Sequence, residues 1–264
     1  MAGAGQLPVQ VILTAQARGR LVRSYCIDKA THRALEKLLP EGHAHYIRQP
    51  GQAQHLLDAM VADGVGEVVF AGKINKWALL RSFNLDALAR RMMRNALSLH
   101  DDQAMVEGVK VLEDQGMKVL PQADFIRQLF IAPGLYSRRQ PTEQEQSDIG
   151  LAMATAREMG RLDIGQTAIV SAGMVIAVEA IEGTDKAIRR CKNLVSPDGG
   201  VVAKVEKPDQ DQRFDIPTVG VKTLESLRYA GLTVLAVEAS KTLAVDVEAM
   251  QRYADKHRLT FVAV

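Results

Sequence analysis

Acidic and basic side chains crowd one stretch in the second half of the sequence. KVEKPDQDQRFDIPTVG spans Lys204–Gly220 between two apolar runs, and Pro208 and Pro217 frame its charged part. Prolines reduce the freedom of an unordered segment, so ordering this one costs less free energy. Acids bind divalent cations and Lys or Arg bind phosphate oxygens, so the composition suits a site that holds a metal and a polyphosphate together. A solvated surface loop is the alternative.

A second acidic segment, VEAIEGTD, spans Val178–Asp185. Glu179 falls among the apolar residues of an expected strand, and Glu182 and Asp185 follow around a glycine turn. These carboxylates are candidates for the same metal site. The alternative is that Glu179 faces water and that Thr184 or Asp185 caps the next helix.

The N-terminal segment GAGQLP, Gly3–Pro8, precedes an expected helix. Two glycines at this place let backbone N–H groups approach a phosphate at the positive end of the helix. Asp28 stands where a ribose-binding acid is expected in a dinucleotide-binding domain, but Pro8 replaces the third glycine of that fingerprint. The pattern therefore indicates either a phosphate-facing turn or a tight structural turn, and it is weak evidence for NAD.

Two further segments have both a functional and a structural explanation. LHDDQAMVEG places Asp101 and Asp102 beside His100, which suits a hard-cation or phosphate-ester site, although capping of a helix explains one carboxylate. The stretch Lys76–Leu99 combines Trp77 and other apolar residues with several arginines. It indicates either a helix with one face in the core or a surface for acyl chains and anionic headgroups.

The elements that must position these residues alternate between strands and helices in the first half of the chain. Expected strands are Leu21–Ile27, Gly66–Gly72 and Met117–Pro121, and expected helices are Leu7–Arg18, Pro50–Met60, Leu85–Ser98 and Asp102–Gln115. This alternation predicts a parallel sheet with helices on both faces.

The second half begins with a polar stretch in which Thr142 and Glu145 form a capping box for a helix near Glu143–Met159. A hairpin is expected around Ser171–Gly173. Further expected elements are a helix from Thr184, a strand at VVAKVEK, a helix at Lys222–Ala230, a strand at LTVLAVEA, a helix opened by Asp246 and a strand at Thr260–Val264. We predict two α/β domains: residues 1–139, Rossmann-like with a parallel sheet, and residues 140–264, mixed α/β with the acidic segments.

Composition narrows the class of protein. The 264 residues are 47% hydrophobic and 24% charged, with a net charge of +2, which gives no reason to expect nucleic acid. Cys26 and Cys191 have no CxxC neighbour, which favours a reduced, cytosolic setting. No apolar run approaches the roughly 20 residues that cross a bilayer, and the N-terminus lacks the order of a signal peptide. We expect a soluble cytoplasmic protein.

These segments, in this order, resemble the bacterial UDP-2,3-diacylglucosamine pyrophosphatases of the lipid A pathway, of the soluble two-domain type rather than the calcineurin-like type. The motifs that carry the resemblance are GAGQLP, AGKI at Ala71–Ile74, HDDQAM, LDIGQTAIV at Leu162–Val170, AVEAIEGTD at Ala177–Asp185 and KPDQDQRFDIPTVG at Lys207–Gly220. The last two are long and unusual, and they make the resemblance specific.

The resemblance implies a hydrolase dependent on a divalent cation, Mg²⁺, that splits UDP-2,3-diacylglucosamine into 2,3-diacylglucosamine 1-phosphate and UMP. It implies a lipid product held between the two domains. We also expect transient contact with the inner membrane surface and no nucleic-acid partner, and a homodimer is compatible with the sequence. Asp215 is the residue most closely tied to catalysis, as a metal ligand or as the acceptor of a proton from water.

The remaining site residues follow from the matching motifs. Predicted catalytic residues besides Asp215 are Asp211, Arg213 and Lys207, and predicted metal ligands are Asp215, Asp185 and Glu182. Predicted substrate-binding residues are Gly3, Gly5, Gln6, Leu7, Gly72, Lys73, Asp101, Asp102, Gln166, Glu182, Gly183, Thr184 and Thr218. Lys207 and Arg213 are expected to neutralise charge that builds up on the pyrophosphate.

The sequence departs from the family pattern at its start, where a longer first strand is expected before Gly3. Loss of that strand would remove a member of the central sheet and the support of the glycine turn. Two alternatives to the hydrolase stay open at this point: a nucleotide-cofactor oxidoreductase that uses GAGQLP and Asp28, and a nucleotide- or lipid-binding module without turnover.

Overall fold

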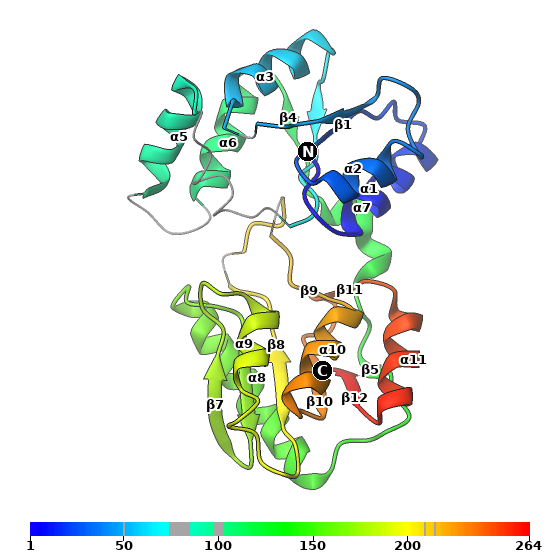
Figure 1. Ribbon diagram of the computed structural model, residues 1–264, viewed down its shortest axis with the longest axis vertical. Coiled ribbons are helices and arrows are strands. Elements are labelled where there is room, and N and C mark those ends of the chain that lie inside the picture. The colour runs from blue at the N-terminus through cyan, green and yellow to red at the C-terminus, as the bar shows by residue number, and fades with distance from the viewer. Residues whose placement is uncertain (50, 74–84, 98–102, 209, 214) are drawn as a thin grey trace. The chain divides into compact units, whose positions relative to one another are not determined.

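The computed structural model (Figure 1) describes residues 1–264 except 50, 74–84, 98–102, 209 and 214. The chain forms two compact units. The first contains Met1–Arg127 and Gln212–Phe214, and the second contains Gln128–Asp211 and Asp215–Val264. The second unit thus includes residues 128–139, which the sequence-based boundary assigns to the first domain.

The first unit alternates short strands with helices, and all of its strand pairs are parallel. Its elements are α1 (Leu7–Ala17), β1 (Ser24–Cys26), α2 (Lys29–Leu35), β2 (Ala44–Tyr46), α3 (Ala53–Ala62), β3 (Glu67–Val68), α5 (Ala87–Leu97), α6 (Gln103–Asp114), β4 (Lys118–Val119) and α7 (Ala123–Ile126), followed by the 3₁₀ helix Arg127–Leu129. The four expected helices and three expected strands are confirmed, whereas α2, β2, α7 and the 3₁₀ helix were not predicted.

The N-terminal residues take the central place among these strands. Ala2 bridges Cys26 on one side and Ala71 on the other, both in parallel. Because β1 pairs with β2 and β3 pairs with β4, the order across the unit is β2, β1, Met1–Gly3, β3, β4. Residues 1–3 thus connect the two strand pairs, so the loss of a sheet member that an absent first strand would cause is not seen in the described residues. The parallel arrangement is confirmed, and the more specific Rossmann-like label stays a prediction.

The second unit is built on a mixed six-stranded sheet of order β5-β12-β10-β8-β6-β7. Its strands are β5 (Gly134–Leu135), β6 (Thr167–Ser171), β7 (Met174–Val178), β8 (Val201–Lys204), β10 (Val234–Val237) and β12 (Thr260–Ala263), with β9 (Thr218–Val219) and β11 (Leu243–Ala244) paired separately. The helices are α8 (Glu143–Arg161), α9 (Thr184–Arg190), α10 (Val221–Ala230) and α11 (Val247–His257). The mixed α/β class is confirmed, and so is the hairpin, where β6 and β7 pair across a turn with positive φ at Ala172 and Gly173.

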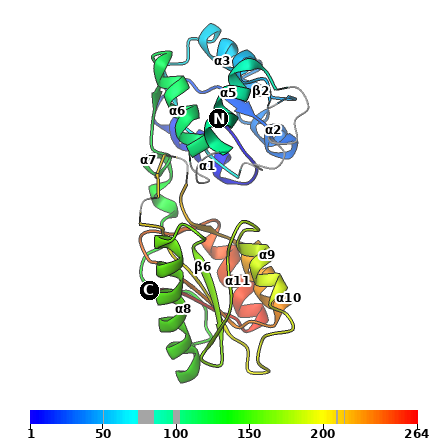
Figure 2. The same cartoon turned by 90° about the vertical axis from the view of Figure 1, so that its left-hand side faces the viewer.

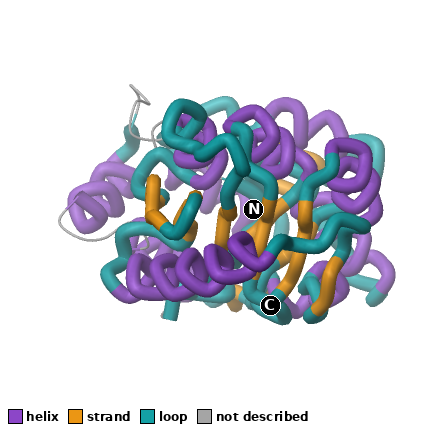
Figure 3. The backbone as a smooth tube through the Cα atoms, turned by 90° about the horizontal axis from the view of Figure 1, so that it is seen from below, coloured by secondary structure: helices purple, strands orange, loops and turns teal. Residues whose placement is uncertain are grey.

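Side chains alternate along each strand, so the sheet has two apolar faces. One face packs on α8, and the other packs on α9, α10 and α11 (Figures 2 and 3). Ala168, Val201 and Ala203 pack on the α8 side. Ile169 and Val202 point to the opposite side, where Leu224 of α10 joins the core. The period of two in each strand therefore decides which helix a residue meets.

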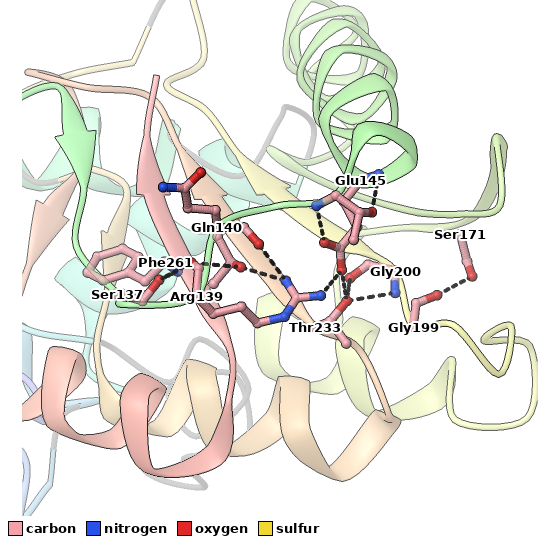
Figure 4. Close-up of polar contacts among 11 residues, drawn as sticks. Ser137, Arg139, Gln140, Glu145, Ser171, Gly199, Gly200, Thr233 and Phe261 are labelled. Carbon is pink, nitrogen blue, oxygen red and sulfur yellow. Dashed lines mark hydrogen bonds and ion pairs between the residues drawn. The ribbon is translucent and has the colours of Figure 1, made fainter.

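A partly buried ion pair between Arg139 and Glu145 lies at the amino ends of the parallel strands β8, β10 and β12 (Figure 4). Arg139 donates to Glu145 at 2.7 Å and to Thr260 at the start of β12 at 2.6 Å. Thr233, just before β10, donates to the same carboxylate at 2.6 Å. Glu145 also completes the predicted capping box with Thr142, which is confirmed. This end of the sheet is thus occupied by structural contacts.

Both cysteines are buried free thiols. Among the described residues, no helix combines the length and apolar character that a membrane span requires.

Candidate active site

The opposite, carboxyl end of the second unit's parallel strands carries most of the predicted site segments. Strands β8, β10 and β12 run in the same direction, so their carboxyl ends share one edge. β6 begins at this edge and β7 ends there, since β6 is antiparallel to both β7 and β8. In open α/β sheets, ligands bind outside the carboxyl ends of the strands. The fold therefore brings the VEAIEGTD segment and the start of the charged loop to a place suited to a ligand.

At this edge, one face of the sheet carries a row of three polar side chains, Lys204, Thr167 and Glu179. Lys204 of β8 lies opposite Thr167 of β6 in the strand register, and the Glu179 N–H donates to the Thr167 carbonyl at 2.8 Å. Cross-strand neighbours point to the same face, so all three side chains continue the face that carries Val202 and Ile169. The apolar core is replaced here by charged and hydroxyl groups.

Thr184, the first residue of α9, connects this row. The Lys204 ammonium donates to the Thr184 hydroxyl at 3.0 Å and to the Thr218 carbonyl at 3.2 Å, and the Thr184 hydroxyl donates to Glu179 Oε1 at 3.0 Å. Lys204 is 7% exposed and Glu179 is 8% exposed. The structure thus brings together two predicted binding residues, Thr184 and Thr218, with the buried side chains of Lys204 and Glu179.

The predicted metal ligands have different surroundings. Asp215 and Asp185 are half-buried, and within the described part of the chain no hydrogen bond or ion pair engages either carboxylate. Glu182 is instead bound by Arg190 at 2.9 Å. A hydrogen bond from its own backbone N–H, with the Arg190 guanidinium, lowers the pKa of Glu182. Glu182 is therefore held in an ion pair, whereas no described residue engages the carboxylates of the two aspartates.

Among the described residues, no cluster of three metal-binding side chains lies at this edge. Across the residues that the structure describes, no group of three or more His, Cys, Asp or Glu is close enough to hold a metal ion. Glu182, Asp185 and Asp215 are all described, so they do not form such a group as predicted. Mg²⁺ itself commonly takes only one or two carboxylates and completes its shell with water and substrate phosphates.

The two basic side chains predicted to be catalytic, Lys207 and Arg213, form ion pairs with other residues. The Lys207 ammonium lies 2.7 Å from the carboxylate of Asp163, which follows α8, and the Lys207 backbone N–H donates to Gln210 Oε1. Arg213 groups with the first unit, where its guanidinium lies 3.7 Å from the Glu113 carboxylate. Asp211, in the same loop, accepts a hydrogen bond from the Asp215 N–H at 2.9 Å through its carbonyl. Gln166 precedes β6, and its carbonyl accepts from the Val205 N–H.

Close backbone packing explains Gly3 and Gly72, whereas Gly5 lies in open space with a positive φ of 110°. A Cβ on Gly3 would lie 2.5 Å from the Lys73 carbonyl oxygen, and one on Gly72 would lie 2.9 Å from the Ala4 carbonyl oxygen. The Gly5 N–H donates to the Thr31 hydroxyl at 3.2 Å. Two N–H groups of the turn, those of Gly3 and Ala4, bond to backbone carbonyls of the segment around Gly72.

Gln6 and Leu7 begin α1, and the Gln6 side chain makes no cap hydrogen bond. Asp28, the suggested ribose-binding acid, caps α2 by accepting from the Thr31 N–H at 2.8 Å. That hydrogen bond is the main cause of its lowered pKa. A cavity of about 410 Å³ in this unit is lined by α1, β1 and β3, but not by Gly3, Gly5, Gly72 or Lys73.

Several predictions fall outside the described residues. They concern Asp101, Asp102, Trp77 and the rest of residues 76–84, 98 and 99 in the Lys76–Leu99 surface. In the part of α5 that is described, Leu88 and Ala89 are buried, which agrees with the core explanation for that helix. Contact with acyl chains and with the inner membrane stays a prediction.

From the sequence, Glu179 was named only among the candidate acids of VEAIEGTD, and Lys204 was given no role in the site. A signal was present, because each is a charged residue inside an apolar strand pattern, Lys204 in VVAKVEK and Glu179 in VIAVEA. Its meaning depended on register: only the pairing of β8 with β6 and β7 shows that the two lie in one row.

Fold and site together define a two-domain α/β protein with a polar, partly charged site at the carboxyl edge of a mixed sheet. The model of the LpxI N-terminal domain matches residues 1–129, and the model of the LpxI C-terminal domain matches residues 132–262. The chain belongs to the LpxI family. It is 31% identical to the UDP-2,3-diacylglucosamine pyrophosphatase LpxI of Caulobacter vibrioides, over 97% of this chain and 92% of that protein. The resemblance found in the sequence is thereby confirmed.

Proposed function

We propose that this protein hydrolyses the pyrophosphate bond of UDP-2,3-diacylglucosamine, releasing 2,3-diacylglucosamine 1-phosphate and UMP in lipid A biosynthesis. The observation that carries the proposal is the family match over both domains, together with a relative of that named activity along nearly the whole chain. The gathering of Lys204, Thr184 and Thr218 at the carboxyl edge supports it, since this is where an α/β sheet binds ligands.

The reaction adds water to one phosphorus of the diphosphate and breaks the bridging P–O bond, with one proton leaving the attacking water. A carboxylate near the diphosphate serves either to accept that proton or to hold a cation. Asp215 fits these roles because it is half-buried and no described residue engages its carboxylate. Asp185 shares these properties.

Dependence on Mg²⁺ is part of the proposal. Asp215 and Asp185 are the carboxylates that would hold the cation, and the substrate phosphates would supply further oxygens. When bound, the cation would stabilise negative charge on the phosphoryl oxygens. Glu182 is the least suited of the three predicted ligands, because Arg190 already pairs with it.

Turnover of purified protein with UDP-2,3-diacylglucosamine, followed as UMP release, tests the proposal. We expect Asp215→Asn to reduce kcat on the order of 10²-fold, as for loss of one preorganised electrostatic group. Asp198→Asn is the matched control, because Asp198 is exposed and precedes β8 at the opposite, amino end of the sheet. A chelator should abolish UMP release, and added Mg²⁺ should restore it.

Two outcomes would contradict separate parts of the proposal. If UMP release were undiminished in the presence of the chelator, the proposed dependence on Mg²⁺ would be wrong. Folded Asp215→Asn with the kcat of the wild type would remove the role of Asp215.

A further inference from the structure

The buried charges at the carboxyl edge call for an explanation beyond stability. Lys204 and Glu179 are both more than nine-tenths buried, and Glu179 Oε2 has no hydrogen-bond partner among the described residues. Taking charges out of water is costly, and apolar residues in place of a buried pair are often neutral or stabilising. Stability alone is therefore a poor reason for placing a lysine and a glutamate in this row.

The direction of each hydrogen bond in the network follows from chemistry. An ammonium group can only donate, so the Thr184 oxygen must accept from Lys204. The hydroxyl has a single proton, and a carboxylate only accepts, so that proton goes to Glu179. Thr184 is thus held from two sides by groups of opposite charge, and only one orientation of its hydroxyl satisfies both.

The same lysine connects two segments that are far apart in the sequence. Besides Thr184, the Lys204 ammonium binds the Thr218 carbonyl, 3.2 Å away. Thr184 directly precedes Asp185, and Thr218 follows Asp215 by three residues. The network therefore holds the backbone next to Asp185 and three residues after Asp215, two aspartates whose carboxylates no described residue engages.

Resting on the proposed function, we propose that Lys204, Thr184 and Glu179 form one positioning unit that holds Asp185 and Asp215 in the geometry needed for hydrolysis. The three side chains act through their neighbours, because the charged pair is buried. Misplacement of a reacting group by about 1 Å can cost about 10²-fold in rate, which sets the size of the expected effect.

Thr184→Val tests the unit because it keeps the shape of the side chain and removes the hydroxyl. We expect kcat for UMP release to fall about 10- to 100-fold, with a smaller change in KM. Thr184→Ser restores the hydroxyl and should stay within about threefold of the wild type. Thr242→Val is the matched control: Thr242 is fully buried in the same unit, and its hydroxyl has no hydrogen-bond partner among the described residues.

A double-mutant cycle separates one unit from independent contributions. If Lys204 acts through Thr184, the variant Thr184→Val/Lys204→Met should have about the kcat of the more impaired single variant. If the two substitutions instead reduced kcat by the product of their separate factors, the proposal would be overturned. Should Lys204→Met fail to fold, the comparison of Val with Ser at position 184 still decides.

The remaining outcomes are also distinct. Thr184→Val that unfolds at lower temperature but keeps the wild-type kcat shows a purely structural role and overturns the inference. Thr184→Ser as impaired as Thr184→Val does the same. Wild-type protein that releases no UMP contradicts the proposed function itself.

Discussion

Replacement of Glu145 by alanine is the perturbation whose effect the structure defines best. The Glu145 carboxylate is 6% exposed and accepts from Arg139 at 2.7 Å, from Thr233 at 2.6 Å and from the Thr142 N–H at 2.8 Å (Figure 4). Removing one partner of a buried ion pair costs about 3–5 kcal/mol, because the other charge is left without compensation. The Arg139 side chain is 27% exposed and can recover some hydration, so we expect the lower end, about 3 kcal/mol.

The assay must report on the second unit alone, because two units need not unfold together. Native-state hydrogen exchange of the α8 amides does so, since it measures the free energy of opening that helix. Glu143→Ala is the matched control: Glu143 lies in the same first turn of α8 but is exposed, and its loss should change that free energy by no more than about 0.5 kcal/mol. If Glu145→Ala also changed it by less than about 1 kcal/mol, the amino-end ion pair would not stabilise the sheet as argued.

Two further predictions concern pH and backbone packing. Burial raises the pKa of Glu145, but its hydrogen bonds from Arg139 and Thr233 outweigh burial and hold the pKa below the ordinary value of 4.5. Its contribution to stability is therefore complete above pH 4.5 and is lost as the pH falls through the lowered value, so the advantage of wild type over Glu145→Gln in urea midpoint should shrink over that acid range. Gly165→Ala should destabilise strongly, because the new Cβ would lie 2.1 Å from the Glu179 carbonyl oxygen, whereas Gly150→Ala, in open space on α8, should stabilise by about 0.5–1 kcal/mol; thermal unfolding measures both.

The sequence by itself determined the class of the fold and the family. Helix and strand periods, the capping box at Thr142 and the hairpin after Ser171 depend on residues close together in the chain, and these elements formed as predicted. The long motifs AVEAIEGTD and KPDQDQRFDIPTVG carried enough information to identify the family, which the domain matches confirm.

Only the tertiary structure decided which charged groups meet. Lys204 and Glu179 share a row because β6 lies between their strands, and a change of register by one residue would turn them to opposite faces. Arg190 forms an ion pair with Glu182, and Asp163 forms one with Lys207, although neither pair is evident from local sequence. Likewise, Ala2 joins the two strand pairs of the first unit through isolated bridges to Cys26 and Ala71, which are distant in the sequence. Local sequence sets each element, but the contacts between distant elements follow from strand order and register, which depend on the packing of the whole unit.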